Sequence, residues 1–224
     1  MKTIAHIKND FQSKFGIPRQ SGIVERIQGK IVFEPEYRTE AAFRGLEDFS
    51  HIWIIWGFSE VRMSDWSPTV RPPLLGGNKR MGVFATRSPF RPNPLGLSSV
   101  RLEKIEYTPD LGPVLTVSGA DLMDGTPIYD IKPYLAYTDS HPEASGGFTD
   151  GLPERSLEVN IPEKLKCKIP PDKLCALTEV LAGDPRPSYI DDPEREFGFP
   201  FAGLEILFTV SGKVLTVTGV SASD

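Results

Sequence analysis

The chain has 224 residues, of which 39% are hydrophobic and 25% are charged, a composition typical of a globular protein with one sizeable core. No apolar run approaches the roughly 18 residues needed to span a bilayer, and the N-terminus turns polar at once. These features argue against a membrane or secreted protein and predict a cytoplasmic one. The net charge of −5, taken as a sum, argues against a polyanionic partner.

Short strands separated by turn-rich loops are expected in the first half of the chain. The apolar pattern predicts an edge strand at residues 3–6, a central strand buried on both faces at 51–58, and further strands at 29–33, 81–85, 114–118 and 126–131. A short helix is expected to begin at Thr39, whose side chain can cap it. Many short strands with Gly and Pro between them favour a barrel or a sandwich over alternating βαβ units.

One further strand, at residues 98–107, carries an irregularity in its apolar pattern. Val100 and Leu102 share one phase, whereas Ile105 and Tyr107 share the other. A slip of one residue turns the following side chains to the opposite face of the sheet, and a β-bulge is a common way to absorb it. We therefore expect a bulge, which is typical of a bent barrel strand.

After about residue 137 the sequence changes character. A loop or linker rich in Gly, Ser and Asp is expected at 138–152, and a helix at 172–182 that ends at Gly183. Two strands at 204–210 and 214–220 predict a β-hairpin. The expected fold class is therefore mainly β (α+β overall), with a barrel or sandwich domain at 1–140 and a small α+β domain at 141–224.

The cysteines and histidines do not predict a metal site. Cys167 and Cys175 are eight residues apart and lack zinc-ligand spacing, so we expect two free thiols packed as small hydrophobic side chains. His51 begins the apolar strand at 51–58, where a hydrogen-bonded core histidine is favoured over a general base. We expect no bound metal.

Positive charge is concentrated in mid-chain, where residues 66–102 contain no Asp or Glu. A local field rather than the total charge steers a phosphate-bearing ligand, so this segment is typical of a polyanion site. A solvated basic loop is the alternative. The segment carries six basic residues: Arg71, Lys79, Arg80, Arg87, Arg91 and Arg101.

Two regions of loop, at residues 15–22 and at 70–97, are rich in Gly, Pro and Arg. Pro89, Pro92 and Pro94 fix the backbone, and a rigid loop loses little entropy when it binds a ligand. The alternative is a stiff barrel corner whose arginines point to water. Neither a G-x-G-x-x-G nor a Walker-type phosphate motif is present, which excludes the Rossmann route to a nucleotide cofactor.

Several motifs in fixed order resemble the TsaA-like (TrmO) family of tRNA N6-threonylcarbamoyladenosine methyltransferases. The resemblance covers about the first 140 residues, and the run from Asp184 to Tyr189 resembles the signature of the C-terminal domain in bacterial members. The motifs are Gly16-Ile17-Pro18-Arg19-Gln20, Asp48-Phe49-Ser50-His51-Ile52-Trp53, Arg91-Pro92-Asn93-Pro94, Asp121-Leu122-Met123-Asp124-Gly125-Thr126-Pro127-Ile128 and Asp130-Ile131-Lys132-Pro133-Tyr134.

The resemblance implies a dimeric single-sheet β-barrel methyltransferase that binds S-adenosylmethionine near the subunit interface. Its substrate would be N6 of threonylcarbamoyladenosine beside the anticodon of tRNA. Many members have a histidine where this chain has Ser59, so a contact there would rest on the backbone. The cofactor contacts carried over are Pro18, Arg19, Gln20, Phe58, Ser59, Arg87, Leu97, Thr126, Pro127 and Ile128.

The chemistry of methyl transfer suggests roles for further residues. The acceptor nitrogen is urea-like, so a group that helps to remove its proton is useful, and Asp124, Asp130 and Tyr134 are the catalytic candidates, with turn or strand-edge roles as the alternative. Arg19 and Arg87 suit the cofactor's carboxylate. For binding tRNA we expect Arg71, Lys79, Arg80, Arg91 and Asn93.

Two other functions stay open at this point. One is a regulatory barrel that binds S-adenosylmethionine or RNA without turnover. The other is a methyltransferase with a small-molecule substrate, in which the basic segment would have no role.

Overall fold

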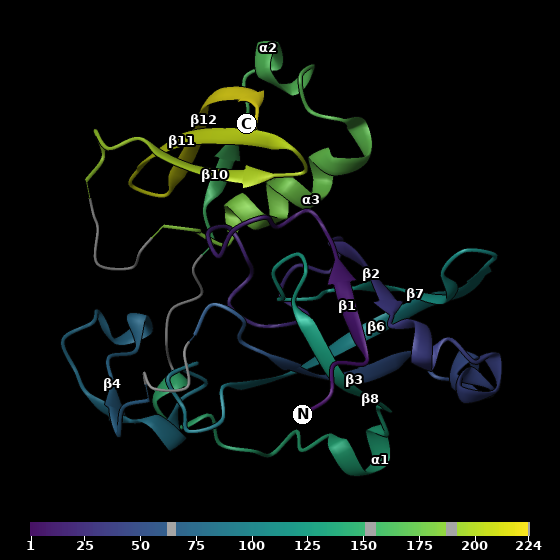
Figure 1. The fold of residues 1–224 in the computed structure, drawn as a ribbon. Helices are drawn as coiled ribbons and strands as arrows, with labels where there is room; N and C mark the ends of the chain where they lie inside the picture. Colours follow the sequence, from purple (N-terminus) through teal and green to yellow (C-terminus); the bar gives the residue numbers. More distant parts are fainter. Residues whose placement is uncertain (62–65, 151–155, 187–191, 224) are drawn as a thin grey trace.

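The computed structural model describes residues 1–61, 66–150, 156–186 and 192–223. It contains a closed six-stranded barrel and, beside it, a four-stranded sheet with its helices (Figure 1). Strand order around the barrel is β1-β2-β7-β6-β3-β8, and every neighbouring pair is antiparallel. The barrel strands are β1 (Ala5–Lys8), β2 (Gln28–Phe33), β3 (His51–Gly57), β6 (Leu95–Thr108), β7 (Gly112–Ser118) and β8 (Pro127–Pro133).

Alternating side chains fill the barrel. Ile52, Ile54 and Trp56 of β3 point inward, whereas the residues between them lie on the outer face. The prediction that this strand is buried on both faces is therefore wrong, although its central position is confirmed. Gly96 lies opposite Trp56, where a Cβ would come within 2.1 Å of the indole Cε2, so the ring requires glycine there.

Closure of the barrel overturns the prediction of an edge strand at 3–6. The strand is β1, and it pairs with β2 on one side and with β8 on the other, where Ala5 lies opposite Ile128. A closed barrel has no edge.

The predicted bulge is confirmed. In the ladder between β6 and β7 the register shifts between Leu102 and Lys104, where the apolar phase of the sequence slips. A second shift, between Ile55 and Trp56, occurs in the ladder between β3 and β8. Such irregularities bend the strands around the barrel.

Three local predictions need correction. Only Met81–Gly82 of the segment 81–85 forms a strand, β5, which pairs with β4 (Thr69–Val70), and Val83–Ala85 is a 3-10 turn, η6. The turn after Thr39 is also a 3-10 turn, η2 (Glu40–Phe43), and the Thr39 side chain does not cap it. His51 is half-buried and hydrogen-bonds Ser50 through Nδ1 at 2.9 Å, so it is not a core residue.

Strand direction gives the barrel two different ends. Loops 9–27, 58–94 and 119–126 all lie at the end that we call the loop end. The opposite end, the sealed end, has loop 34–50 and the turn at 109–111. Its 3-10 turns η1 (Pro35–Tyr37), η2 and η3 (Leu46–Asp48) pack against the barrel, with the rings of Phe33 and Phe43 4.7 Å apart.

The C-terminal sheet has the order β10-β11-β12-β9, and the predicted hairpin around Gly212 is confirmed. Its elements are β9 (Glu158–Asn160), β10 (Phe197–Phe201), β11 (Leu204–Ser211), β12 (Val214–Ala222), α2 (Glu163–Lys166) and α3 (Pro171–Ala182). The predicted helix is α3, and Leu177 and Leu181 are buried on it. Part of the segment expected as a loop forms α1 (Ala136–Asp139) and η7 (Gly147–Thr149), and residues 151–152 lie outside the described residues.

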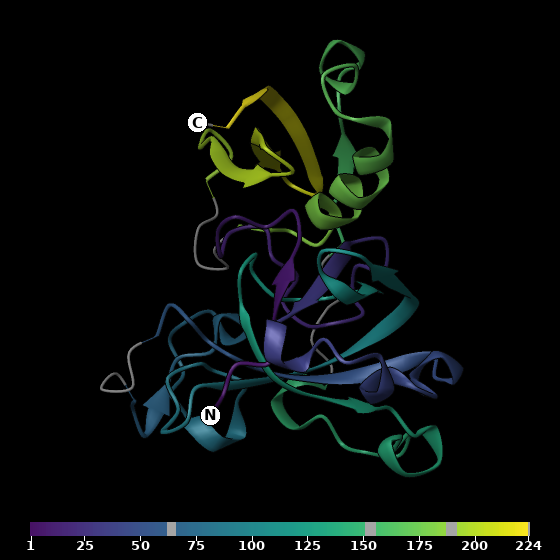
Figure 2. The same cartoon turned by 45° about the vertical axis from the view of Figure 1, so that its right-hand side comes forward.

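The C-terminal sheet packs against loop 9–27, as Figure 2 shows. Phe11, Val24 and Ile27 belong to its hydrophobic core rather than to the core of the barrel. The division at residue 140 stays a prediction, but the two parts share this core. The sheet therefore lies at the loop end.

Cys167 and Cys175 are free thiols, and both are exposed, so the expectation that they pack as small hydrophobic side chains is wrong. Among the described residues no helix is long and apolar enough to cross a membrane.

Candidate functional site at the loop end of the barrel

Two segments far apart in the sequence meet at the loop end. The Arg87 guanidinium donates a hydrogen bond to Oε1 of Gln20, and Nε2 of Gln20 donates to the Arg19 carbonyl at 2.5 Å. The Arg19 guanidinium in turn donates to the carbonyl of Asp184, at 3.4 Å. The two Arg-bearing regions that the sequence singled out are thus in contact.

Asp121 lies where these segments reach the barrel. The Ser98 hydroxyl donates to Oδ1 of Asp121 at 2.5 Å, and the Trp56 indole N–H donates to Oγ of Ser98 at 2.9 Å. Ser98 is fully buried. Burial raises the pKa of Asp121, because the charged form loses solvation.

Other contacts of Asp121 act in the opposite direction. The Ser98 hydrogen bond, backbone hydrogen bonds from Asp121 itself and from Ser21, and the charge of Arg87 all lower its pKa, but burial is the larger effect. The backbone N–H of Gly22 donates to the Gly119 carbonyl at 2.9 Å, which fastens loop 9–27 to loop 119–126. Asp121 is therefore hydrogen-bonded to loop 9–27 and to the barrel, and it also feels the charge of Arg87.

Apolar side chains lie beside this polar group. The Phe58 ring is 4.4 Å from the Trp56 ring, and the Phe58 N–H donates to the Pro94 carbonyl at 3.0 Å. Leu97 lies on the outer face opposite Ile55 and is 58% exposed. Ser59 lies in an exposed turn. Phe58 and Leu97 could thus contact the apolar part of a ligand.

The start of β8 offers a ligand a packing surface rather than free hydrogen-bonding groups. The side chains of Thr126 and Ile128 are buried in the barrel, and Pro127 is half-buried. The carbonyls of Thr126 and Ile128 accept hydrogen bonds from Ile7 and Ile4, at 3.2 and 2.8 Å. Within one chain these groups are already paired.

Asp124, the first catalytic candidate, helps to hold the loop in place. Its Oδ1 accepts a hydrogen bond from the Asn9 backbone N–H at 3.0 Å, and its Oδ2 lies 3.7 Å from Nζ of Lys8. This arrangement matches the turn-forming alternative.

The other two catalytic candidates lie along the outside of the barrel. Asp130 pairs with Ile55, two strands away from Leu97, and its Oδ2 forms an ion pair with Lys132 at 3.3 Å. Tyr134 follows the other end of β8, about 20 Å along the strand from Ile128 at roughly 3.3 Å per residue. The structure does not bring Tyr134 next to Arg87 and Gln20 within one chain.

The residues expected to bind tRNA differ in their exposure and in their hydrogen bonds within the chain. Arg71 and Lys79 are exposed, and Arg80 is exposed while donating to Oγ1 of Thr69 at 2.8 Å. The Arg91 guanidinium donates to two backbone carbonyls, of Val83 and Thr86, at 3.1 and 2.7 Å, and so braces its own loop. The carbonyl of Asn93, an exposed residue, accepts from Leu95.

Sequence reasoning assigned no role to Asp121. A signal was present, since the aspartate stands between Ala120 and Leu122 directly after an apolar strand, and both neighbours are fully buried. A carboxylate in such a position is expected to need partners. The identity of these partners depends on tertiary contacts.

The motif from Asp184 onward lies beside Arg19. Asp184 is buried and forms an ion pair with Arg186 at 2.8 Å, with a positive φ of 53°. Residues 187–189 of the motif lie outside the described residues.

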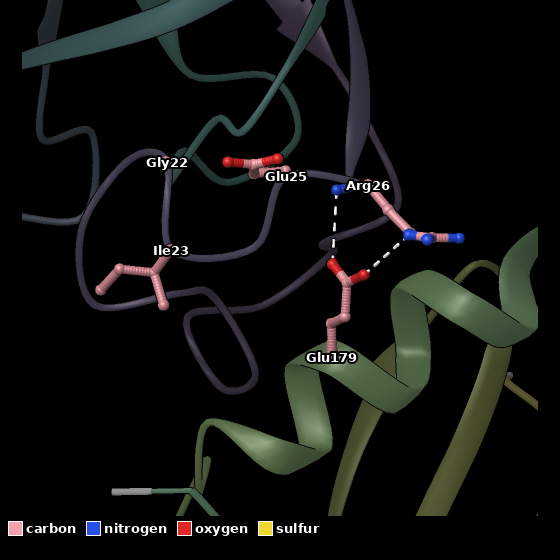
Figure 3. A pocket seen from close by; sticks show the side chains of 5 residues that line it. All are labelled: Gly22, Ile23, Glu25, Arg26 and Glu179. Carbon is pink, nitrogen blue, oxygen red and sulfur yellow. Dashed lines mark hydrogen bonds and ion pairs between the residues drawn. The ribbon is translucent and has the colours of Figure 1, made fainter. Parts of the chain in front are cut away.

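Two hollows flank loop 9–27. One, of about 330 Å³, is lined by Gly22, Ile23, Glu25, Arg26 and Glu179, and Figure 3 shows the ion pair of Arg26 with Glu179 at 2.9 Å that joins the loop to α3. The other, of about 350 Å³, lies between loop 9–27 and β10. Arg87 and Leu97 line neither hollow.

Two family models match the chain. Residues 6–140 match the tRNA-methyltransferase O N-terminal domain, and residues 157–223 match the TrmO C-terminal domain. The chain is 42% identical over 192 residues to the tRNA (adenine(37)-N6)-methyltransferase of Escherichia coli (strain K12), covering 83% of this chain and 81% of that protein. It is 45% identical to the enzyme of the same name from Eikenella corrodens, covering 79% of this chain and 99% of that protein.

Solved structures show the same likeness. The crystal structure of TrmO from Pseudomonas aeruginosa aligns with a TM-score of 0.77 at 30% identity, over 98% of this chain and 97% of that chain. The likeness extends over the barrel and the C-terminal sheet.

Proposed function

The chain belongs to the tRNA-methyltransferase O (TrmO) family, and from that premise we propose that it transfers a methyl group from S-adenosylmethionine to N6 of threonylcarbamoyladenosine beside the anticodon of tRNA. The observation that supports this most is the meeting of loops 9–27 and 58–94 beside Asp121, where the Ser21 backbone and the charge of Arg87 act on the carboxylate and Arg87 bonds Gln20.

The residues at the loop end fit the chemical groups of the cofactor. Guanidinium groups bind carboxylates with paired hydrogen bonds, so Arg19 and Arg87 would hold the methionine carboxylate. Asp121 would face the cationic part, and Phe58 and Leu97 the adenine. The remaining proposed contacts are Pro18, Gln20 and the backbone of Ser59, with Thr126, Pro127 and Ile128 as the wall.

When bound, the cofactor supplies an electrophilic methyl group, so this chain must orient the acceptor nitrogen and take up its proton. We assign the proton to Asp121, because its raised pKa makes it a better base than an exposed aspartate. Asp124, Asp130 and Tyr134 stay as alternatives. The variants Asp124→Asn, Asp130→Asn and Tyr134→Phe distinguish them, because only the true base should abolish turnover when replaced.

The function is tested with S-adenosylmethionine labelled in its methyl group and with tRNA that carries threonylcarbamoyladenosine. We expect label at N6 of that nucleoside and none in tRNA that lacks the modification. Binding of the cofactor without label in RNA, at micromolar enzyme, would instead favour a regulatory barrel. Label in a small molecule alone would favour a methyltransferase with a small-molecule substrate.

The basic segment is the proposed tRNA surface. Arg71, Lys79 and Arg80 are exposed and project from the loops around the site, so they are suited to phosphates, whereas Arg91 and Asn93 would act by holding the loop in shape. Phosphate contacts predict a steep dependence of tRNA binding on salt.

We further propose a homodimer that works in the cytoplasm with its tRNA substrate. Several large apolar side chains around the loop end are exposed, which a partner subunit would cover. They are Trp66, Phe84, Phe90 and Leu97. Sedimentation equilibrium tests the dimer: a monomer at micromolar concentration would contradict it.

A further inference from the structure

The hollow of about 350 Å³ joins the barrel to the C-terminal sheet. Phe15 and Gly16 line it from loop 9–27, and Arg195, Phe197 and Phe208 line it from the side of β10 and β11. Arg186 also lines it. No residue that we assign to the cofactor lines this pocket.

The two walls of the pocket are held together. Gly16 has a positive φ of 84°, and a Cβ there would lie 2.4 Å from Cδ2 of Phe199, so the loop packs directly on β10. The Phe197 and Phe208 rings are stacked with centroids 5.7 Å apart. The pocket is therefore formed before any ligand arrives, which lowers the entropy cost of binding.

Its lining combines aromatic rings with cations. Phe15 is 50% exposed and has Nζ of Lys14 5.9 Å from its ring centre, and Phe197 has the Arg195 guanidinium at 5.4 Å. Proteins bind single-stranded nucleic acid with this combination, because bases stack on aromatic rings while cations attract the phosphates.

The pocket also lies a short length of chain away from the proposed methylation site. Gln20, which bonds Arg87, is four positions after Gly16, and this stretch of chain spans at most about 14 Å. Arg19 donates to the carbonyl of Asp184, whose carboxylate pairs with Arg186 in the pocket wall. A short stretch of single-stranded RNA can reach from one place to the other.

One acidic side chain, Glu196, also lines the pocket, and its Oε1 accepts a hydrogen bond from the Thr218 hydroxyl at 2.7 Å. Carboxylates accept hydrogen bonds from the amino groups of bases. Glu196 can therefore accept a hydrogen bond from the edge of a base. The phosphate of the same nucleotide is expected to lie beside the cationic side chains.

We propose that this pocket binds one unpaired nucleotide of the tRNA strand near the methylated adenosine, with its base against Phe15 and Phe197 and its phosphate toward Arg195. The inference rests on the proposed function. It adds a second anchor for RNA that involves both parts of the chain.

The test measures dissociation constants of anticodon stem-loop RNA that carries threonylcarbamoyladenosine. Abasic substitutions are placed one at a time at the unpaired positions other than the modified one. For the wild type, one position should weaken binding by about 5- to 150-fold, the range expected for loss of one stacked base. The double variant Phe15→Ala/Arg195→Ala should bind the intact RNA that much more weakly and be insensitive to that abasic position.

A matched control removes the same groups elsewhere. Arg44→Ala/Tyr107→Ala deletes an exposed guanidinium and a ring that is 51% exposed, both at the sealed end, and should bind and respond as the wild type does. The proposal is overturned if the double variant stays as sensitive as the wild type to every abasic position. It is also overturned if the double variant weakens binding of S-adenosylmethionine rather than of RNA. If the double variant loses sensitivity to one abasic position as expected, but the wild type does not methylate this RNA, the proposed function fails while the proposed pocket stands.

Discussion

The two ends of the barrel show how the same six strands serve different purposes. At the sealed end, 3-10 turns cover the core and Phe33 and Phe43 pack edge to face. At the loop end, polar groups enter the barrel instead, with Ser98 fully buried and hydrogen-bonded to the carboxylate of Asp121. Apolar side chains that cover the core stabilise a fold, whereas a carboxylate inside it costs stability unless the carboxylate is well paired. The comparison indicates that the sealed end serves stability alone, whereas the loop end also carries the groups suited to chemistry.

The largest expected effect is at Asp121. In Asp121→Asn we expect methyl transfer to fall by about 100-fold or more, which is typical for loss of a general base. Because burial raises the pKa of this carboxyl, its ionised form costs folding stability as pH rises through that pKa, so Asn should not lower the melting temperature at neutral pH. Single-turnover kinetics and thermal melts check both parts. Unchanged turnover would remove Asp121 from catalysis.

The reverse pattern is expected at the sealed end. Phe43 is 4% exposed, and Phe43→Ala should destabilise the protein by about 3–5 kcal/mol while the folded fraction retains its turnover rate. Urea titration with activity normalised to folded protein is the measurement. Tyr107→Ala, an exposed ring at the same end, is the control and should change stability by less than about 0.5 kcal/mol.

A smaller effect is expected for the basic residues at the loop end, and it tests whether they bind RNA. Replacing Lys79 and Arg80 together by Ala should weaken tRNA binding and reduce the slope of log K against log salt by roughly 1.4–1.8, since each phosphate contact contributes about 0.7–0.9. Binding isotherms at several salt concentrations measure it. An unchanged slope would favour the small-molecule reading of the function.

The smallest effect concerns Asp139, beyond the sealed end. A hydrogen bond from the Leu135 backbone N–H and one from the Trp53 indole lower the pKa of its carboxyl. Such a group stabilises the fold when charged, and this contribution is lost as pH falls through the lowered pKa. The melting temperature of Asp139→Asn should therefore lie slightly below that of the wild type at neutral pH and converge with it in acid. Parallel melting curves at all pH values would contradict this.

The sequence predicted what depends on local pattern. The slip between Leu102 and Ile105 located the bulge, and glycine and proline after Ala182 located the end of α3. Closure of β1 on β8 and the partial burial of Asp121 escaped prediction, because both arise from contacts between residues on different elements of the barrel, such as Ala5 with Ile128 and Ser98 with Asp121. Gln20 and Arg87 were identified as site residues without their mutual contact, for the same reason.

The account depends most on Asp121 acting as the proton acceptor, and the pH dependence of single-turnover methylation tests this directly. The rate should rise with pH through one group whose pKa lies above the ordinary value of 3.8, and Ser98→Ala should move that limb to higher pH, because the Ser98 hydrogen bond lowers the pKa of Asp121. A wild-type profile without an acid limb, or a limb that Ser98→Ala leaves in place, would contradict the account.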